Sequence, residues 1–187
     1  MQEVLTQHLS TAEYLAWEEQ QEEKHEYEDG RIYAMAGASE NHIIITDNCT
    51  AFLVPKLRGG PCRSFSSDMR VNITENIYYY PDLLITCDER DRLHRNHKSY
   101  PCLIMEVLSE STEARDRGVK FAHYQTIESL QEYVLISQSA QRIEVFRRYN
   151  SKLWLLQTYT TGETIQLQSI NLEIPIAEIY AGIDFGE

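Results

Sequence analysis

The expected fold depends on the stretch YYYPDLLITCDE (residues 78–89), an aromatic and aliphatic run that predicts a strand. A second such run follows in PCLIMEVLSE (residues 101–110). Asp82 and Glu106 each lie at an edge of an apolar run, so we expect both to project from neighbouring strands of one sheet. Two carboxylates at the ends of adjacent strands can share a divalent cation, because Mg²⁺ selects hard oxygen ligands.

Each of these acids also has an ordinary structural interpretation. Pro81 fixes φ and lacks an N–H, so it suits the start or edge of a strand, and Asp82 taken alone favours a turn there. Glu106 could lie on the solvated face of a half-exposed strand. However, the residues around Glu106 are apolar on both alternating faces of the strand, which implies that both faces are covered. A carboxylate in that environment needs a partner.

A positively charged candidate for the same site, Lys120, lies in RDRGVKFAHYQ (residues 115–125). We expect a helix here that packs back on the sheet. A lone helical lysine usually faces solvent or forms a surface ion pair, and only the two acids favour a role for Lys120. Two carboxylates with a nearby ammonium group would suit metal-assisted hydrolysis of a phosphodiester.

Three further polar residues are weaker candidates. Glu40 and His42 lie in the first turn of a helix that Ser39 is expected to cap. Glu40 can equally complement the helix N-terminus, and His42 can be an ordinary surface or core histidine. Each could otherwise reach the outer shell of the metal. For Asp68, a role in a turn or an ion pair is the safer interpretation.

The remaining pattern predicts an α/β chain with a mixed sheet flanked by helices. A first helix at residues 11–22 is followed by a hairpin whose turn is Asp29-Gly30. Further helices are expected at residues 39–55 and 111–126, and strands at 63–73, 78–86, 101–107, 132–137, 142–149 and 153–160, before a closing strand and short helix in 167–180. With no repeat or linker-like stretch, we expect one domain over residues 1–187.

Composition places further limits on the chain. Its 187 residues, 42% of them hydrophobic, suffice for one well-packed core. No apolar stretch approaches the ~20 residues that span a bilayer, and the N-terminal sequence lacks the pattern of a secretory signal. We therefore expect a cytoplasmic protein without membrane contact. The cysteines, at positions 49, 62, 87 and 102, lack zinc-site spacing and are expected to be small buried apolar residues.

The net charge of −12 argues against nucleic-acid binding, but the acidity is unevenly distributed. Residues 1–30 hold nine acids and one lysine, whereas residues 56–120 hold eleven basic and ten acidic side chains. The segment DERDRLHRNHK (residues 88–98) mixes four basic residues, two histidines and three acids. It can be a solvated flexible loop, or a loop that follows a phosphate backbone.

The chain closely resembles the bacterial putative restriction endonuclease family formerly catalogued as domain of unknown function 820, of the PD-(D/E)XK nuclease-like superfamily. Family-like stretches follow one another in the family's order: EYEDGRIYAMAGAS, SFSSDMRV, YYYPDLLI, CLIMEVLSEST, DRGVKFAHYQ and EYVLI. The resemblance covers nearly the whole chain. It implies a restriction-endonuclease-like fold with an N-terminal helix and hairpin.

The resemblance also implies roles for particular residues. Asp82 and Glu106 match the two acids that bind the metal, together with the Val107 carbonyl. Leu108 stands where the superfamily pattern has lysine, and the family's helix lysine, here Lys120, is the implied replacement. Glu40 and His42 also match positions at which further site residues are implied.

The implied activity is hydrolysis of a DNA phosphodiester with Mg²⁺ or Mn²⁺, by a metal-dependent endonuclease. Lys120 would orient the nucleophile or stabilise charge in the transition state. A homodimer is a candidate assembly, because cutting a duplex needs two cuts. One alternative is a catalytically inactive interaction or nucleic-acid-binding module on a nuclease fold, and another is a metal-dependent hydrolase of a small phosphorylated substrate.

Overall fold

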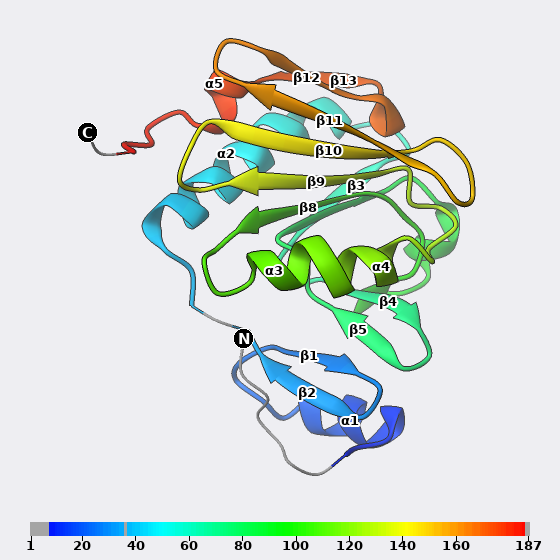
Figure 1. The fold of residues 1–187 in the computed structure, drawn as a ribbon. Helices are drawn as coiled ribbons and strands as arrows, with labels where there is room; N and C mark the ends of the chain where they lie inside the picture. The colour runs from blue at the N-terminus through cyan, green and yellow to red at the C-terminus, as the bar shows by residue number, and fades with distance from the viewer. Residues whose placement is uncertain (1–7, 36, 186–187) are drawn as a thin grey trace.

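A mixed six-stranded sheet forms the centre of the fold (Figure 1). The structure is a computed structural model that describes residues 8–35 and 37–185. In spatial order the strands are β11 (Trp154–Thr160), β10 (Arg142–Arg148), β9 (Glu132–Ser137), β8 (Pro101–Leu108), β6 (Leu83–Thr86) and β3 (Arg63–Ser66). β8 and β9 are parallel, while the other neighbours in this sheet are antiparallel. The predicted mixed sheet is therefore confirmed.

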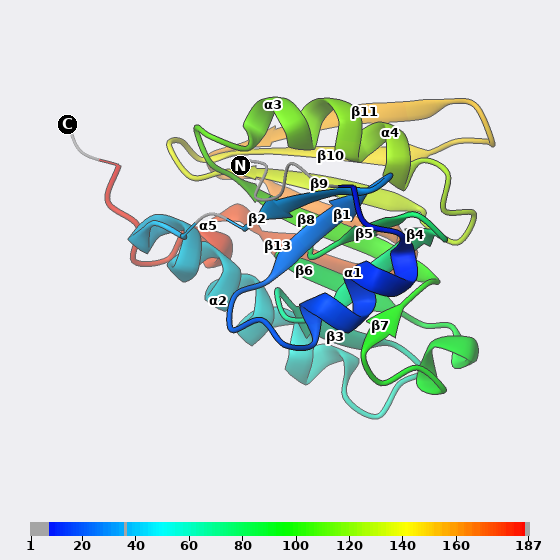
Figure 2. The same ribbon diagram turned by 90° about the horizontal axis from the view of Figure 1, so that it is seen from below.

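Helices cover both faces of this sheet (Figure 2). On one face lies α2 (Glu40–Leu57), and on the other a continuous helical segment made of α3 (Glu113–Arg115), the π-helical turn η2 (Asp116–Lys120) and α4 (Phe121–Tyr124). Side chains alternate along β8: Met105 packs on the α2 side, and Ile104 packs with Tyr124 on the other. Glu106 therefore projects towards the α3–α4 segment.

A smaller sheet carries the N-terminal part of the chain. Its strands, in spatial order, are β2 (Arg31–Ala34), β1 (His25–Glu28), β5 (Ile77–Tyr79), β4 (Arg70–Thr74) and β7 (His97–Lys98), and α1 (Thr11–Glu18) packs against them. The predicted hairpin turn is confirmed, with Asp29 at φ 46° and Gly30 at φ 94°. Tyr14 of α1 stacks on Tyr27 of β1, with ring centroids 4.5 Å apart.

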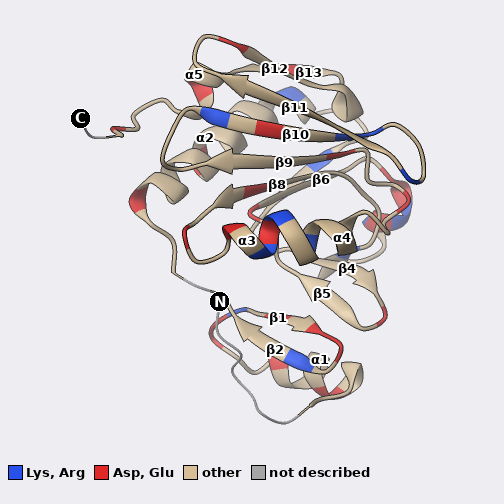
Figure 3. Ribbon diagram, in the orientation of Figure 1, with Lys and Arg blue, Asp and Glu red and all other residues tan. Residues whose placement is uncertain are grey.

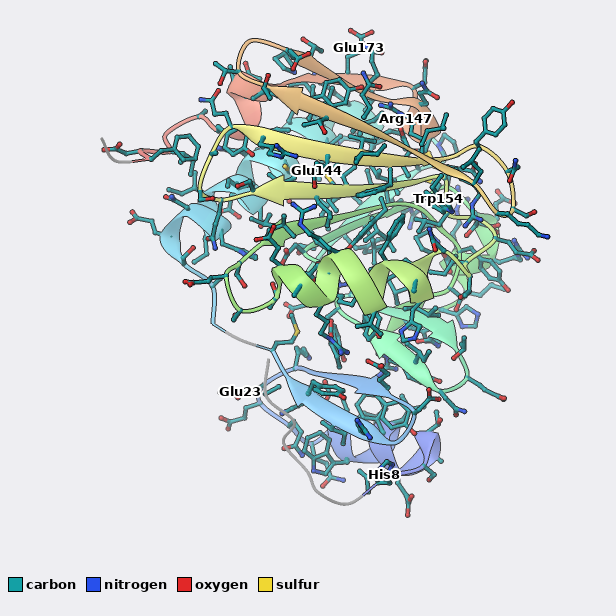
Figure 4. All side chains as sticks on the ribbon, in the orientation of Figure 1. His8, Glu23, Glu144, Arg147, Trp154 and Glu173 are labelled. Atoms are coloured by element: carbon teal, nitrogen blue, oxygen red, sulfur yellow. A yellow bond between two sulfur atoms is a disulfide. The ribbon has the colours of Figure 1, made fainter. Side chains whose placement is uncertain are left out.

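The C-terminal part of the chain covers one end of the large sheet. It contains β12 (Thr164–Leu167), the 3₁₀ turn η3 (Gln168–Ile170), β13 (Leu172–Pro175) and α5 (Ile176–Ile179). At the start of β11, Trp154 lies beside α4, with its ring 5.5 Å from that of Phe121 (Figure 4). The core thus extends on the α4 side to the edge strand.

Two predicted strands are each divided between the two sheets. The stretch 63–73 forms β3 and β4, separated by a turn in which the Met69 N–H donates to the Ser66 carbonyl. The stretch 78–86 forms β5 and β6, separated at Tyr80-Pro81-Asp82. Pro81 has no N–H to donate, so the ladder is interrupted where the chain passes from one sheet to the other.

The prediction for the cysteines is wrong at two positions. Cys62 and Cys87 form a disulfide, with Cα atoms 3.9 Å apart. The antiparallel pairing of Arg63 with Thr86 explains it, because it places the preceding and following residues opposite each other. Cys49 is a buried free thiol, as predicted, and the free Cys102 lies 3.5 Å from the Cys87 sulfur.

The membrane and targeting expectations have different outcomes. None of the helices in the described part of the chain is both long and apolar enough to cross a membrane. The expectation that the N-terminal stretch is not a secretory signal concerns residues 1–7 in part, and these lie outside the described residues.

Candidate active site

Two hydrogen bonds from backbone N–H groups connect the segments that carry Asp82 and Glu106. Asp82 lies just before β6, where the chain leaves the small sheet, and its Oδ2 accepts a 2.7 Å hydrogen bond from the Val107 N–H of β8. In return the Asp82 N–H donates to Glu106 Oε2 at 3.2 Å. Asp82, just before β6, and Glu106, within the neighbouring strand β8, therefore lie close together.

Glu106 is 4% exposed and is held on its other oxygen by the helical segment. Lys120 Nζ lies 2.6 Å from Glu106 Oε1, and the Tyr124 hydroxyl donates to the same oxygen at 3.0 Å. Burial raises the pKa of Glu106 to about 8; Lys120 opposes this shift, while Asp116 and Asp82 add to it. Burial therefore disfavours the charged form of this carboxyl, and a positive charge beside it would favour the carboxylate.

Lys120 is 3% exposed, so it is not the solvent-facing residue that a lone helical lysine usually is. Its Nζ also lies 3.2 Å from Asp116 Oδ1 and 3.2 Å from Glu26 Oε1. Burial disfavours the charged ammonium, but Glu106, Glu26 and Asp116 outweigh it and raise the pKa of Lys120 well above its usual range. We therefore expect Lys120 to be protonated at neutral pH.

The wide turn η2 supplies both Asp116 and Lys120. π-helical turns within helices are rare and frequently occur at functional sites. Figure 3 shows acidic and basic bands alternating along this helical segment. The four-residue spacing of Asp116 and Lys120 places both on one side of the segment, facing β8.

Glu26 is a site residue that the sequence did not indicate. It lies on β1 of the small sheet, is 1% exposed, and neither carboxylate oxygen accepts a hydrogen bond from the described residues. Besides Lys120, its charged neighbour is Arg115, with Nε 3.7 Å from Oε2. Nothing in the acid-rich N-terminal sequence distinguishes Glu26 from the acids around it. Asp116 could have been found from its spacing to Lys120.

The other predicted residues divide into two groups. His42 joins the site, with Nε2 2.9 Å from Asp82 Oδ1. Glu40 is exposed in the first turn of α2 and is not among the residues that line the cavity, and Asp68 is exposed in the turn between β3 and β4. The structure thus brings Asp82, Glu106, Lys120 and His42 together and leaves Glu40 and Asp68 apart.

The residues that the structure brings together line one cavity of about 640 Å³. Its wall combines residues from both sheets, from α2 and from the α3–α4 segment, including Glu26, His42, Asp82, Glu106, Asp116 and Lys120. Acidic side chains outnumber basic ones in this wall. A polyanionic substrate could bind here only with added positive charge.

The donor set fits a magnesium-like ion that keeps much of its own hydration. Among the described residues no group of three or more His, Cys, Asp or Glu side chains is arranged to hold a metal. Asp82 and Glu106 supply two carboxylates, and Mg²⁺ is commonly bound by one or two carboxylates with water and substrate phosphate. Three buried acids around Lys120 also leave negative charge that a cation would offset.

Comparisons with known proteins identify the family of this chain. Residues 11–177 match the family Uma2, described as "Putative restriction endonuclease". An uncharacterized protein of Synechocystis sp. (strain ATCC 27184 / PCC 6803 / Kazusa), slr1290, is 44% identical over 179 residues, covering 95% of this chain and 94% of that protein. A second, sll1609, is 39% identical over 87% of this chain and 93% of its own length.

A solved structure shares the fold. It is the crystal structure of a putative nuclease belonging to domain of unknown function 820 from Anabaena variabilis, with a TM-score of 0.77 and 16% identity. The likeness covers 92% of this chain and 98% of that chain. The expected nuclease-like α/β fold is therefore confirmed.

Proposed function

Because this chain belongs to the Uma2 family of putative restriction endonucleases, we propose that it is a DNA endonuclease that depends on Mg²⁺ or Mn²⁺. The observation that carries the proposal is the convergence of Asp82, Glu106 and Lys120 from three separate elements, with Lys120 Nζ 2.6 Å from Glu106. Burying this cluster of charges is costly, which favours a functional role for it.

Each residue has a distinct part in the proposed reaction. Asp82 and Glu106 would hold the cation, and the Val107 carbonyl would be a further oxygen ligand. When bound, the ion would polarise a phosphoryl oxygen and lower the pKa of its water. Lys120 orients the attacking water or stabilises the negative charge that develops on the phosphorus oxygens.

Two further contacts position the acids. His42 fixes the Asp82 carboxylate through Oδ1, while the Tyr124 hydroxyl fixes Glu106 through Oε1. Preorganised ligands lose less entropy when the cation and substrate bind. In this proposal the substrate is DNA in the cytoplasm, and a homodimer would place two sites on one duplex.

Plasmid cleavage tests the proposal, in Mg²⁺, in Mn²⁺ and in EDTA. Wild type should nick or linearise the plasmid only with the metal, and Asp82→Asn should lower the rate by at least about 10³-fold, because a metal ligand is lost while the side-chain shape is kept. Circular dichroism should show the variant folded.

Glu40→Gln is the matched control, because it removes one acid that lies outside the cavity. It should cleave at the wild-type rate. Cleavage in EDTA, or cleavage unaffected by Asp82→Asn, would contradict the proposal. A folded wild type that binds DNA and never cuts it would instead favour the inactive binding module.

A further inference from the structure

A second cavity, of about 340 Å³, lies at the opposite end of β3 and β6 from Asp82. We call it the basic pocket; it is lined by Pro61, Arg63, Phe65, Thr86, Asp88, Asp91, Arg92, His94, Arg95 and Lys98. Most of these residues come from the charged segment 88–98, which the proposed reaction does not use.

The segment that forms the basic pocket has a fixed internal structure. Lys98 is 4% exposed, and its Nζ donates to the Asp91 carbonyl at 2.8 Å and to the His94 carbonyl. The buried Asp91 carboxylate accepts from the Ser99 and Tyr100 N–H groups at 2.8 and 3.1 Å. Two buried charges thus fix this backbone, so the segment is not simply a solvated connector.

Positive charge at the rim of the basic pocket is available to a ligand. Arg63 and Arg95 are exposed, and no described residue forms an ion pair or hydrogen bond with either side chain. The negative charge of Asp88 is offset by Arg90, whose Nε and Nη2 lie 3.0 and 2.7 Å from it. The pocket is therefore a locally positive hollow on a chain of net charge −12.

β3 connects the basic pocket to the candidate active site. Arg63 and Phe65 line the pocket, while Ser66 and Ser67 line the active-site cavity. Arg63 and Ser66 are three residues apart along β3, about 10 Å along its axis, and their side chains project to opposite faces of the strand. That length corresponds to roughly three base-pair steps of a duplex.

We propose that the basic pocket binds a phosphate of the DNA backbone a few nucleotides from the bond that is cut. This rests on the proposed function, in which the substrate is DNA. Arginine side chains suit the role, because a guanidinium binds phosphate through paired, charge-assisted hydrogen bonds. The pocket supplies the positive charge for the DNA backbone that the acidic active-site cavity lacks. It would thereby hold the duplex beside β3.

Fluorescence anisotropy with a labelled mixed-sequence duplex, in EDTA and over a series of NaCl concentrations, tests the proposal. Arg63→Ala/Arg95→Ala should weaken binding at least about tenfold at low salt. It should also reduce the slope of log K against log salt by about 1, for the one phosphate that the pocket neutralises.

The matched control is Lys24→Ala/Lys152→Ala, which removes the same charge away from the pocket. It should bind with the wild-type salt slope. Equal slopes and affinities for the two double variants would overturn the proposal. So would a pocket that binds inorganic phosphate while Arg63→Ala/Arg95→Ala still binds the duplex like the control.

Plasmid cleavage by the same proteins separates this proposal from the endonuclease itself. If wild type cuts and Arg63→Ala/Arg95→Ala binds and cuts like the control, the basic pocket is refuted and the endonuclease stands. If that variant alone loses duplex binding but wild type never cuts, the pocket stands and the endonuclease is refuted.

Discussion

Lys120 offsets only part of the negative charge around it. Glu106, Asp116 and Glu26 all approach its ammonium group, and all four residues are buried. Such a group is stabilised by the mutual attraction of its members and strongly destabilised when one partner is removed. The excess of buried negative charge therefore has two consequences. It attracts a cation to the site, and it makes the stability of the fold depend on Lys120.

Replacing Lys120 by methionine should lower the free energy of unfolding by about 3–5 kcal/mol, since it leaves three buried carboxylates without the ammonium. The loss should grow as the pH rises past about 8, the pKa that burial gives Glu106 in the wild-type protein. Without the lysine, Glu106 binds its proton still more tightly in the folded state, so the variant loses more stability than wild type as the pH rises through this range. Urea unfolding at several pH values in EDTA measures this effect.

Glu106→Gln in the Lys120→Met background provides the control. It removes one of the uncompensated charges at nearly constant volume, so the double variant should be more stable than Lys120→Met alone at pH 8. A Lys120→Met protein as stable as wild type at pH 8 would show that the carboxylates do not surround this ammonium.

At the scale of elements, the turn residues explain where strands begin and end. Pro81 separates β5 from β6, which puts Asp82 at the mouth of β6 rather than inside a strand. Asp29-Gly30 fixes the register of β1 on β2, and β1 carries Glu26. The candidate site therefore depends on a hairpin whose sequence gave no sign that it lies beside Lys120.

Gly30→Ala should lower the free energy of unfolding by about 1–3 kcal/mol, because Gly30 has φ 94° and a Cβ there would lie 2.7 Å from His8 Nδ1. Thermal or urea unfolding measures it. Gly37→Ala is the control, since a Cβ at Gly37 meets no atom within 4 Å, and it should differ from wild type by well under 1 kcal/mol. Equal stabilities for the two variants would contradict the structural account of this turn.

At the scale of the whole molecule, two sheets meet at the site. Glu26 comes from the small sheet, Glu106 from the large one, and Lys120 from the helical segment between β8 and β9. No local sequence window contains more than one of these three residues. Their meeting, and the acidic cavity that results, follow from how the sheets pack.

The disulfide is a second consequence of long-range pairing. Protein denatured without reductant should show two free thiols, Cys49 and Cys102, and a peptide linking Cys62 to Cys87 by mass spectrometry. The antiparallel register of β3 and β6 is the physical reason. Four free thiols in freshly isolated protein would contradict it.

The sequence by itself indicated most of the elements and the pair of acids Asp82 and Glu106. Apolar runs marked the strands, Asp29-Gly30 marked the hairpin, and Ser39 marked the start of α2. Asp82 and Glu106 were predictable because a carboxylate beside or within a buried apolar run needs a partner. These features depend on local spacing, which a single sequence displays directly.

Only the tertiary structure decided which side chains meet. It brought Lys120 onto Glu106, added Glu26 from the other sheet, left Glu40 in solvent, and placed Arg63 beside the segment 88–98. Contacts between residues far apart in the chain depend on strand order and register, which are set by burial of the whole apolar surface. The acids were therefore visible in the sequence, but the balance of charge around them was not.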